Sequence, residues 1–139
     1  MTGRILLVEA DVALGAVLAE VLWQRGYEVI VVKTLRDEKV DHIHSMTAVI
    51  LDIDTISVDH EVTWLKACHP YYESLPIVLM GLQEPRELRE RLRFQLGRRK
   101  TTALPLVQKP FRNEQLLAVV REAEESSEAN SSSRERVQS

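Results

Sequence analysis

The chain has 139 residues, of which 45% are hydrophobic and 28% are charged, and its formal net charge is −3. These values are those of one ordinary globular domain that is long enough to bury a core. The small negative charge excludes a general electrostatic attraction to nucleic acid or to an anionic membrane. No apolar stretch approaches the roughly 18 residues that a membrane-spanning helix needs.

The chain contains one cysteine, Cys68, and therefore no internal disulfide. The first apolar run ends at Val8 and is followed directly by Glu9, so it is too short for the core of a signal peptide. Both features predict a reducing, cytoplasmic compartment.

The first half of the chain alternates between short apolar runs and helical patterns. Apolar runs typical of strands buried on both faces occupy residues 5–8, 29–32 and 48–51. Asp11 is placed to cap a helix that ends near Gly26, because apolar residues follow it at spacings of three and four. A weaker helix is expected over residues 35–45.

The second half repeats this alternation. The pattern predicts a short helix over residues 60–68, a strand over 77–80 and a strong helix over 84–96. A short strand over 106–108 and a last helix, capped by Asn113, follow. Because alternating strands and helices require crossover connections, we predict an α/β fold with a doubly wound, five-stranded parallel sheet.

The chain changes character near residue 124. The remaining residues are polar or charged and offer almost nothing to bury. We therefore predict a folded domain over residues 1–123 and a disordered polar tail or linker over residues 124–139.

Charged residues stand where several predicted strands end. Glu9 follows the first strand, Asp52 and Asp54 follow the third, and Lys109 follows the fifth, whereas the fourth ends in Gly81. Ligands of open parallel sheets bind outside the carboxyl ends of the strands. Neighbouring strands lie about 4.8 Å apart, so these residues are expected to form an acidic cluster beside one lysine.

Such a cluster suits phosphoryl chemistry. A Mg²⁺ ion prefers oxygen ligands and relieves repulsion between carboxylates. A carboxylate can act as a nucleophile and form an aspartyl phosphate. A cation and an ammonium group then neutralise charge on the transferred phosphoryl oxygens.

Four segments, residues 5–11, 48–53, 75–80 and 105–111, resemble the first, third, fourth and fifth strands of response-regulator receiver domains of the CheY-like family. The resemblance extends from about Arg4 to Ala123. It implies a flavodoxin-like (βα)5 fold with strand order 2-1-3-4-5. It also implies a role in two-component or phosphorelay signal transduction.

The resemblance implies roles for four residues. Asp52 matches the phosphoacceptor, and Lys109 matches the lysine that contacts the phosphoryl group. Glu9 matches the first acid of the metal-binding pair, and the backbone carbonyl of Asp54 would complete the Mg²⁺ ligands together with Asp52. A histidine kinase or phosphotransfer protein would then be the donor, and self-phosphorylation or dephosphorylation at Asp52 would be the only enzymatic activity.

Four positions depart from the family pattern. Ala10 replaces the main metal-ligating carboxylate, and Gly81 replaces the threonine or serine whose hydroxyl contacts the phosphoryl group. Leu106 replaces the switch aromatic, and Ile56 replaces a proline. These degenerate positions imply that Mg²⁺ binding is weak or absent.

Two functions therefore stay open. The chain is either a receiver with an atypical phosphorylation pocket or a pseudo-receiver that binds proteins without phosphorylation, with Lys109 as a salt-bridge partner for Asp52. A small flavin-binding protein of similar topology is disfavoured, because the first strand-to-helix loop lacks a phosphate cradle.

The resemblance places the partner surface on residues 84–96, 106–108 and 113–123, and a homodimer through this face is an alternative. The helix over 84–96 and the residues after it are rich in arginine and end in Arg98, Arg99 and Lys100. Interleaved glutamates can pair with these cations, as Glu87 can with Arg91. This favours a solvated face and a protein partner over nucleic acid.

Overall fold

The computed structural model describes residues 3–69, 72, 74–96 and 104–138. In chain order, its strands (β), helices (α) and one 3₁₀ turn (η1) are β1 (Arg4–Val8), α1 (Val12–Gln24), β2 (Glu28–Val32), η1 (Leu35–Asp37), α2 (Val40–His44), β3 (Ala48–Asp52), α3 (Val58–Cys68), β4 (Ile77–Gly81), α4 (Arg86–Leu96), β5 (Leu106–Gln108) and α5 (Asn113–Gln138).

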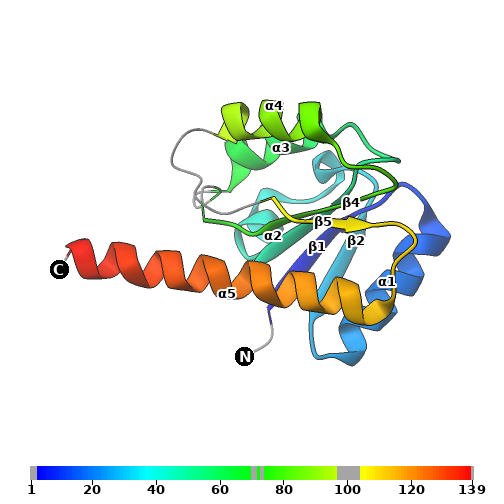
Figure 1. The fold of residues 1–139 in the computed structure, drawn as a ribbon, viewed down its shortest axis with the longest axis horizontal. Coiled ribbons are helices and arrows are strands. Elements are labelled where there is room, and N and C mark those ends of the chain that lie inside the picture. Colours follow the sequence, from blue (N-terminus) through cyan, green and yellow to red (C-terminus); the bar gives the residue numbers. More distant parts are fainter. Residues whose placement is uncertain (1–2, 70–71, 73, 97–103, 139) are drawn as a thin grey trace.

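The strands form one sheet in the order β2-β1-β3-β4-β5 (Figure 1). Each neighbouring pair is parallel. This confirms the predicted doubly wound α/β fold and its strand order. Since the strands all point the same way, their carboxyl ends lie at one edge of the sheet. The charged residues that follow the strands were expected to meet at this edge.

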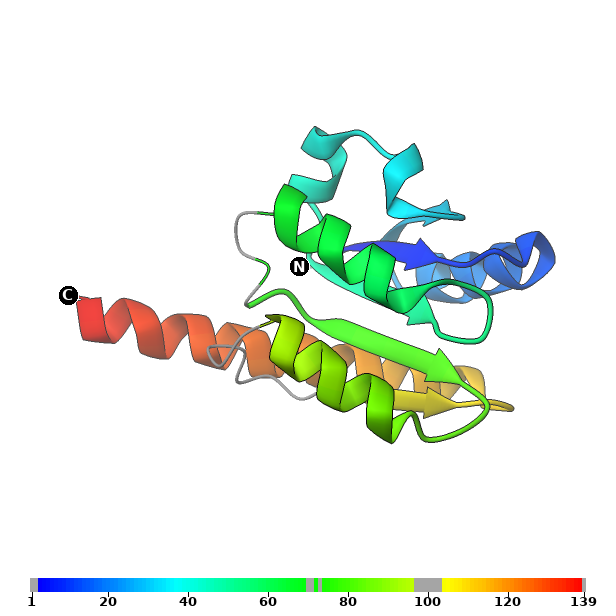
Figure 2. The same ribbon diagram turned by 90° about the horizontal axis from the view of Figure 1, so that it is seen from above.

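Helices cover both faces of the sheet (Figure 2). The cluster on one face joins strand residues such as Ile50 to Leu18 and Leu22 of α1 and to Leu116 and Val120 of α5. The cluster on the other face joins alternate strand residues to η1, α2, α3 and α4. Burial on both faces explains why the central strands are wholly apolar.

The helix starts agree with the sequence in part. Asp11 caps α1 as predicted, because its Oδ1 accepts from the Leu14 N–H at 3.1 Å. The predicted helix over 35–45 is instead divided into η1 and α2, since Glu38 and Lys39 are extended. At α5, Gln115 Oε1 accepts from the Arg112 N–H at 2.7 Å, so the cap is Arg112 and not Asn113.

Helix α5 differs from the predicted tail. Its helical backbone continues to Gln138 and extends beyond the sheet (Figure 1), through residues expected to be disordered. No glycine or proline follows Pro110 to end the helix. The Tyr27 hydroxyl also donates to Glu124 Oε1 at 2.7 Å, which ties the first residue of the predicted tail to the domain.

None of the helices in the described ranges combines the length and apolar character needed to cross a membrane.

Truncation within α5 tests where the stable domain ends. Ending the chain after Glu125 should change the free energy of unfolding by no more than about 0.5 kcal/mol. Ending it after Leu117 removes the fully buried Val120 and the Glu124 hydrogen bond. That loss should cost about 2 kcal/mol or more. Urea unfolding of both variants measures this, and equal losses would contradict a domain boundary near residue 125.

Candidate functional site

The strand ends bring four of the predicted site residues together. Asp52 is the last residue of β3 and is fully buried, while Glu9 and Lys109 follow β1 and β5 directly. Backbone hydrogen bonds to neighbouring strands hold two of them in place. The Glu9 N–H donates to the Val32 carbonyl at 2.9 Å, and the Lys109 N–H donates to the Gly81 carbonyl at 2.8 Å. The peptide bond from Lys109 to Pro110 is cis. The roles that the resemblance gives these residues stay predictions.

Lys109 lies between two carboxylates. Its Nζ is 2.7 Å from Asp52 Oδ2 and 3.3 Å from Asp54 Oδ2. Burial works to lower the pKa of Lys109, but hydrogen bonds and charge attraction from both acids outweigh it and raise the pKa above its ordinary value. The lysine is therefore a fixed cation at the strand ends.

Asp52 is ionised and has partners on both oxygens. Its Oδ1 accepts from the Asp54 N–H at 3.0 Å, and its Oδ2 accepts from Lys109. Burial works to raise its pKa, but hydrogen bonds from Glu9 and Lys109 hold the pKa below its ordinary value. The carboxylate is thus stabilised within the protein.

Glu9 lies beside Asp52 and holds its proton up to about neutral pH. Burial, and then the hydrogen bond to Asp52, raises its pKa from 4.5 to about 7. Its Oε1 accepts from the Asp11 N–H and from Thr55 Oγ1, both at 2.9 Å. Its Oε2 is buried and finds no donor among the described residues. Burial of this unpaired oxygen disfavours the charged carboxylate, which agrees with the raised pKa of Glu9.

Thr55 was not predicted as part of the site. Its hydroxyl donates to Glu9 Oε1. The same hydroxyl oxygen accepts a long hydrogen bond, of 3.4 Å, from the N–H of the exposed Ala10. The only sequence signal was its place in the loop that follows Asp52.

The Asp54 side chain enters the pocket and joins the acidic cluster beside Lys109 that the strand ends predicted, whereas the resemblance gave a role only to its backbone carbonyl. Besides contacting Lys109, Asp54 Oδ2 accepts from the Leu82 N–H at 3.0 Å. The Leu82 carbonyl in turn accepts from Gln108 Nε2 at 3.1 Å. The first residue after β4 is therefore held on both sides of its backbone.

A larger side chain at Gly81 would require Ile53 to move from the conformation that it adopts. A Cβ atom at this position would lie 2.5 Å from Ile53 Cγ1 and 2.6 Å from Ile53 Cδ1. Ile53 thus fills the space that a threonine or serine would use. The other two degenerate positions, Leu106 and Ile56, are half-buried and pack against the core on the α3–α4 side of the sheet.

The donor set does not fit a Mg²⁺ ion. Ala10 supplies no oxygen, so Glu9 and Asp52 are the expected ligand side chains that remain, and both already accept hydrogen bonds from the protein. Within the described residues, no three histidine, cysteine, aspartate or glutamate side chains are grouped so that they could hold a metal. Hard cations need several free oxygen ligands.

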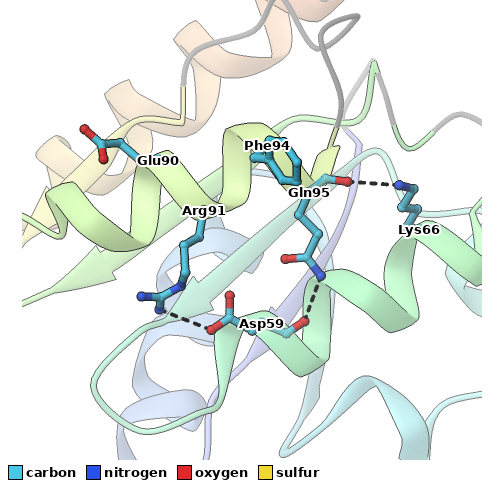
Figure 3. A pocket seen from close by; sticks show the side chains of 6 residues that line it. All are labelled: Asp59, Lys66, Glu90, Arg91, Phe94 and Gln95. Carbon is cyan, nitrogen blue, oxygen red and sulfur yellow. Dashed lines mark hydrogen bonds and ion pairs between the residues drawn. The ribbon is translucent and has the colours of Figure 1, made fainter.

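A second feature is a groove of about 780 Å³ between α3 and α4 (Figure 3). Arg91 and Gln95 point from α4 toward α3, where Arg91 pairs with Asp59 at 3.2 Å. Lys66 Nζ donates to the Gln95 carbonyl at 3.0 Å. Phe94 lines the same groove and is 91% exposed. The predicted cations Arg98, Arg99 and Lys100 lie outside the described residues.

Comparisons with known proteins identify the fold. The sequence matches no protein-family model, and no curated protein matches it either. The chemotaxis protein CheY4 of Vibrio cholerae superposes with a TM-score of 0.69 at 19% identity, over 88% of this chain and 99% of that one. A CheY-like receiver domain protein of Methanospirillum hungatei gives 0.70 at 19% identity, over 94% and 99%.

NtrX of Brucella abortus, in complex with ATP, gives a TM-score of 0.75 at 23% identity over 96% of this chain. The chain spans only 29% of the length of that protein. Together these similarities show that the chain has the fold of response-regulator receiver domains.

Restoring a hydroxyl at Gly81 tests the packing against Ile53. Gly81→Thr should lower the free energy of unfolding by about 1–3 kcal/mol, because the new side chain overpacks the site. Adding Ile53→Ala should recover part of the loss that Gly81→Thr causes, which urea unfolding of both singles and the double variant measures. Additive losses would show that the two residues do not share this space.

The protonation of Glu9 predicts a pH dependence of stability. The pKa of Glu9 rises from 4.5 to about 7 in the folded state, so folding favours the protonated form. The contribution of Glu9 to the free energy of unfolding is therefore complete below about pH 4.5 and is lost as the pH rises through about 7. Between about pH 5 and pH 8 this loss should reach at most about 3 kcal/mol in wild type and be absent in Glu9→Gln. Equal pH slopes in urea unfolding would refute the assignment of the proton to Glu9.

Proposed function

We propose that the chain is a pseudo-receiver, a signalling module of the receiver fold that binds a protein partner without phosphorylation of Asp52. The observation that supports this most strongly is that the Lys109 ammonium is already neutralised by two carboxylates of the same chain. A phosphoryl group would have to compete with Asp54 for that cation.

The pocket also lacks parts that phosphoryl transfer uses. Both oxygens of Asp52 accept hydrogen bonds, from the Asp54 N–H and from Lys109, so the carboxylate is already stabilised inside the pocket. Ala10 contributes no metal ligand, and Ile53 fills the space beside Gly81. Without a metal ion or a hydroxyl group, neutralisation of the charge on a transferred phosphoryl group would depend on Lys109 alone.

The partner surface that we propose is the face formed by α4, β5 and α5, with α4 as its centre. Phe94 on α4 is the most exposed of the large hydrophobic residues. Exposed aromatic residues often supply a large share of the binding energy of protein interfaces. Phe94 is therefore the residue of α4, beside the α3–α4 groove, that a signalling protein, or a second copy of the chain, would cover.

A receiver that accepts a phosphoryl group is the second candidate. It is favoured by the lowered pKa of Asp52, since a nucleophilic carboxylate must be ionised. In this case a histidine kinase or phosphotransfer protein would be the donor, and the Asp54 carboxylate would have to leave Lys109 first.

Intact mass separates the two candidates. Wild-type protein and Asp52→Asn are incubated with Mg²⁺ and acetyl phosphate, a small acyl phosphate donor. The pseudo-receiver predicts no gain of the roughly 80 Da that a covalent phosphoryl intermediate adds, in either protein.

A gain of this mass in wild type, absent from Asp52→Asn, would overturn the proposal and establish the second candidate. Mass loss on mild alkaline treatment would confirm that the added group is an acyl phosphate. A gain in both proteins would reflect modification elsewhere, and Asp52 would still be inactive.

A further inference from the structure

Strand β2 forms an open edge of the sheet, beside α1 (Figure 1). Its neighbour in the sheet is β1, on one side only. The Glu28 N–H and the Val32 carbonyl both form hydrogen bonds on the β1 side. Because the backbone groups of alternate residues point to the same side of a strand, the N–H and C=O groups of Val29 and Val31 point away from the sheet.

The sequence of β2 does little to prevent pairing with another strand. Its residues, EVIVV, include four β-branched side chains in a row and no proline or lysine, the residues with which proteins commonly guard an exposed edge. Val31 is 38% exposed. An edge of this kind is a template for one more strand.

Helix α1 adds apolar side chains that the fold leaves uncovered. Val12 is 67% exposed and Trp23 is 66% exposed. Together with the exposed Ala16 and the half-buried Ala19, they follow one another at spacings of four, three and four, and so form one side of the helix, the α1 flank. Glu20 is the only charged residue of α1. A helix this apolar is usually covered on all sides.

The α1 flank borders the open edge of β2. A Cβ atom on Gly15 would lie 2.9 Å from Val31 Cγ1, so α1 packs directly on β2 at this point. Around the helix, the flank lies next to Gly15, on the side away from Leu14 and Leu18, which pack against the core. The flank and the strand edge therefore form one continuous apolar surface.

We propose that a second copy of the chain binds this surface, with its β2 antiparallel to the first β2 and its α1 antiparallel to the first α1. A two-fold axis through Ile30 would pair Val29 of each copy with Val31 of the other, so that their outward N–H and C=O groups bond to one another. The sheet would continue through the dimer. This interface goes beyond the proposed function, because it leaves the face formed by α4, β5 and α5 free for a signalling protein.

The α1 flank is centred on the same two-fold axis. Helix α1 runs against β2, because it connects two parallel strands, and its Gly15 lies over Val31. The middle of the flank, between residues 17 and 18, lies about 4 Å further along the helix, which corresponds to roughly one strand residue. It therefore lies over Ile30, where the strand pairing places the axis.

The side chains are complementary in this arrangement. Two helices that each lie over their own β1–β2 pair would be about 10 Å apart, a distance at which helices pack. Ala16 would face the small Ala19 of the other copy at the centre, and Trp23 would cover Val12 of the other copy at each end.

Charge favours the antiparallel order as well. The exposed Asp11 stands at the start of α1 and the exposed Arg25 at its end. Antiparallel helices place these unlike charges near each other, whereas parallel helices would bring like charges together.

Sedimentation velocity of the full chain tests the dimer. Wild type should sediment as a dimer at high concentration and dissociate on dilution. Val12→Glu should raise the dissociation constant at least about tenfold, because it places a charge against Trp23 of the other copy. Val17→Glu is the matched control and should dimerise as wild type does, since Val17 is 59% exposed on the same helix but lies off the flank.

Amide hydrogen exchange tests the strand pairing without any substitution. The Val29 and Val31 N–H groups should exchange at least about tenfold more slowly in the dimer than in the monomer. The N–H groups of Glu28 and Ile30, which point toward β1, should exchange at the same rate in both. This measurement decides the question even if Val12→Glu does not fold.

A chain that stays monomeric at every concentration would overturn the inference, as would equal weakening by Val12→Glu and Val17→Glu or unchanged exchange at Val29 and Val31. A dimer that Phe94→Ala abolishes would place the contact on α4 and would overturn it too. None of these readouts involves Asp52, so they are independent of the test for phosphorylation.

Discussion

The ammonium group of Lys109, held between the carboxylates of Asp52 and Asp54, is the interaction on which the site depends. A buried carboxylate is costly unless a charge and hydrogen bonds compensate it. Lys109 supplies that compensation to Asp52, and the cis peptide bond to Pro110 lies directly beside it. In the proposed function, an external phosphoryl group would have to compete with both carboxylates for this lysine.

The departures from the receiver pattern support one another physically. Glycine at position 81 accommodates Ile53, which would collide with any larger side chain there. Alanine at position 10 removes a carboxylate, and Glu9 can then keep a proton that a bound metal ion would displace. Asp54 supplies a negative charge close to Lys109. A substitution of Gly81 toward the usual pattern therefore requires Ile53 to move.

The sequence was sufficient for the fold because periodicity and strand-end residues are local signals. The apolar strands and the Asp11 cap followed from these signals, whereas the order of the sheet followed from the resemblance to receiver domains. The site was predictable only as a set of positions, since the resemblance indicates where Asp52 and Lys109 lie but not what their neighbours do. The side-chain direction of Asp54, the hydrogen bond from Thr55 and the packing of Ile53 depend on tertiary contacts. The sequence did not predict that α5 continues to Gln138, although no glycine or proline there breaks a helix. The disorder of residues 124–139 stays a prediction.

The most direct test of the closed pocket is a double-mutant cycle between Asp54 and Lys109. The free energies of unfolding of wild type, Asp54→Ala, Lys109→Met and the double variant give the coupling between the two side chains. A pocket closed by its own charges predicts a favourable coupling of about 1 kcal/mol or more. A coupling within about 0.3 kcal/mol of zero would mean that Asp54 does not hold Lys109, and that the cation is free for an external anion.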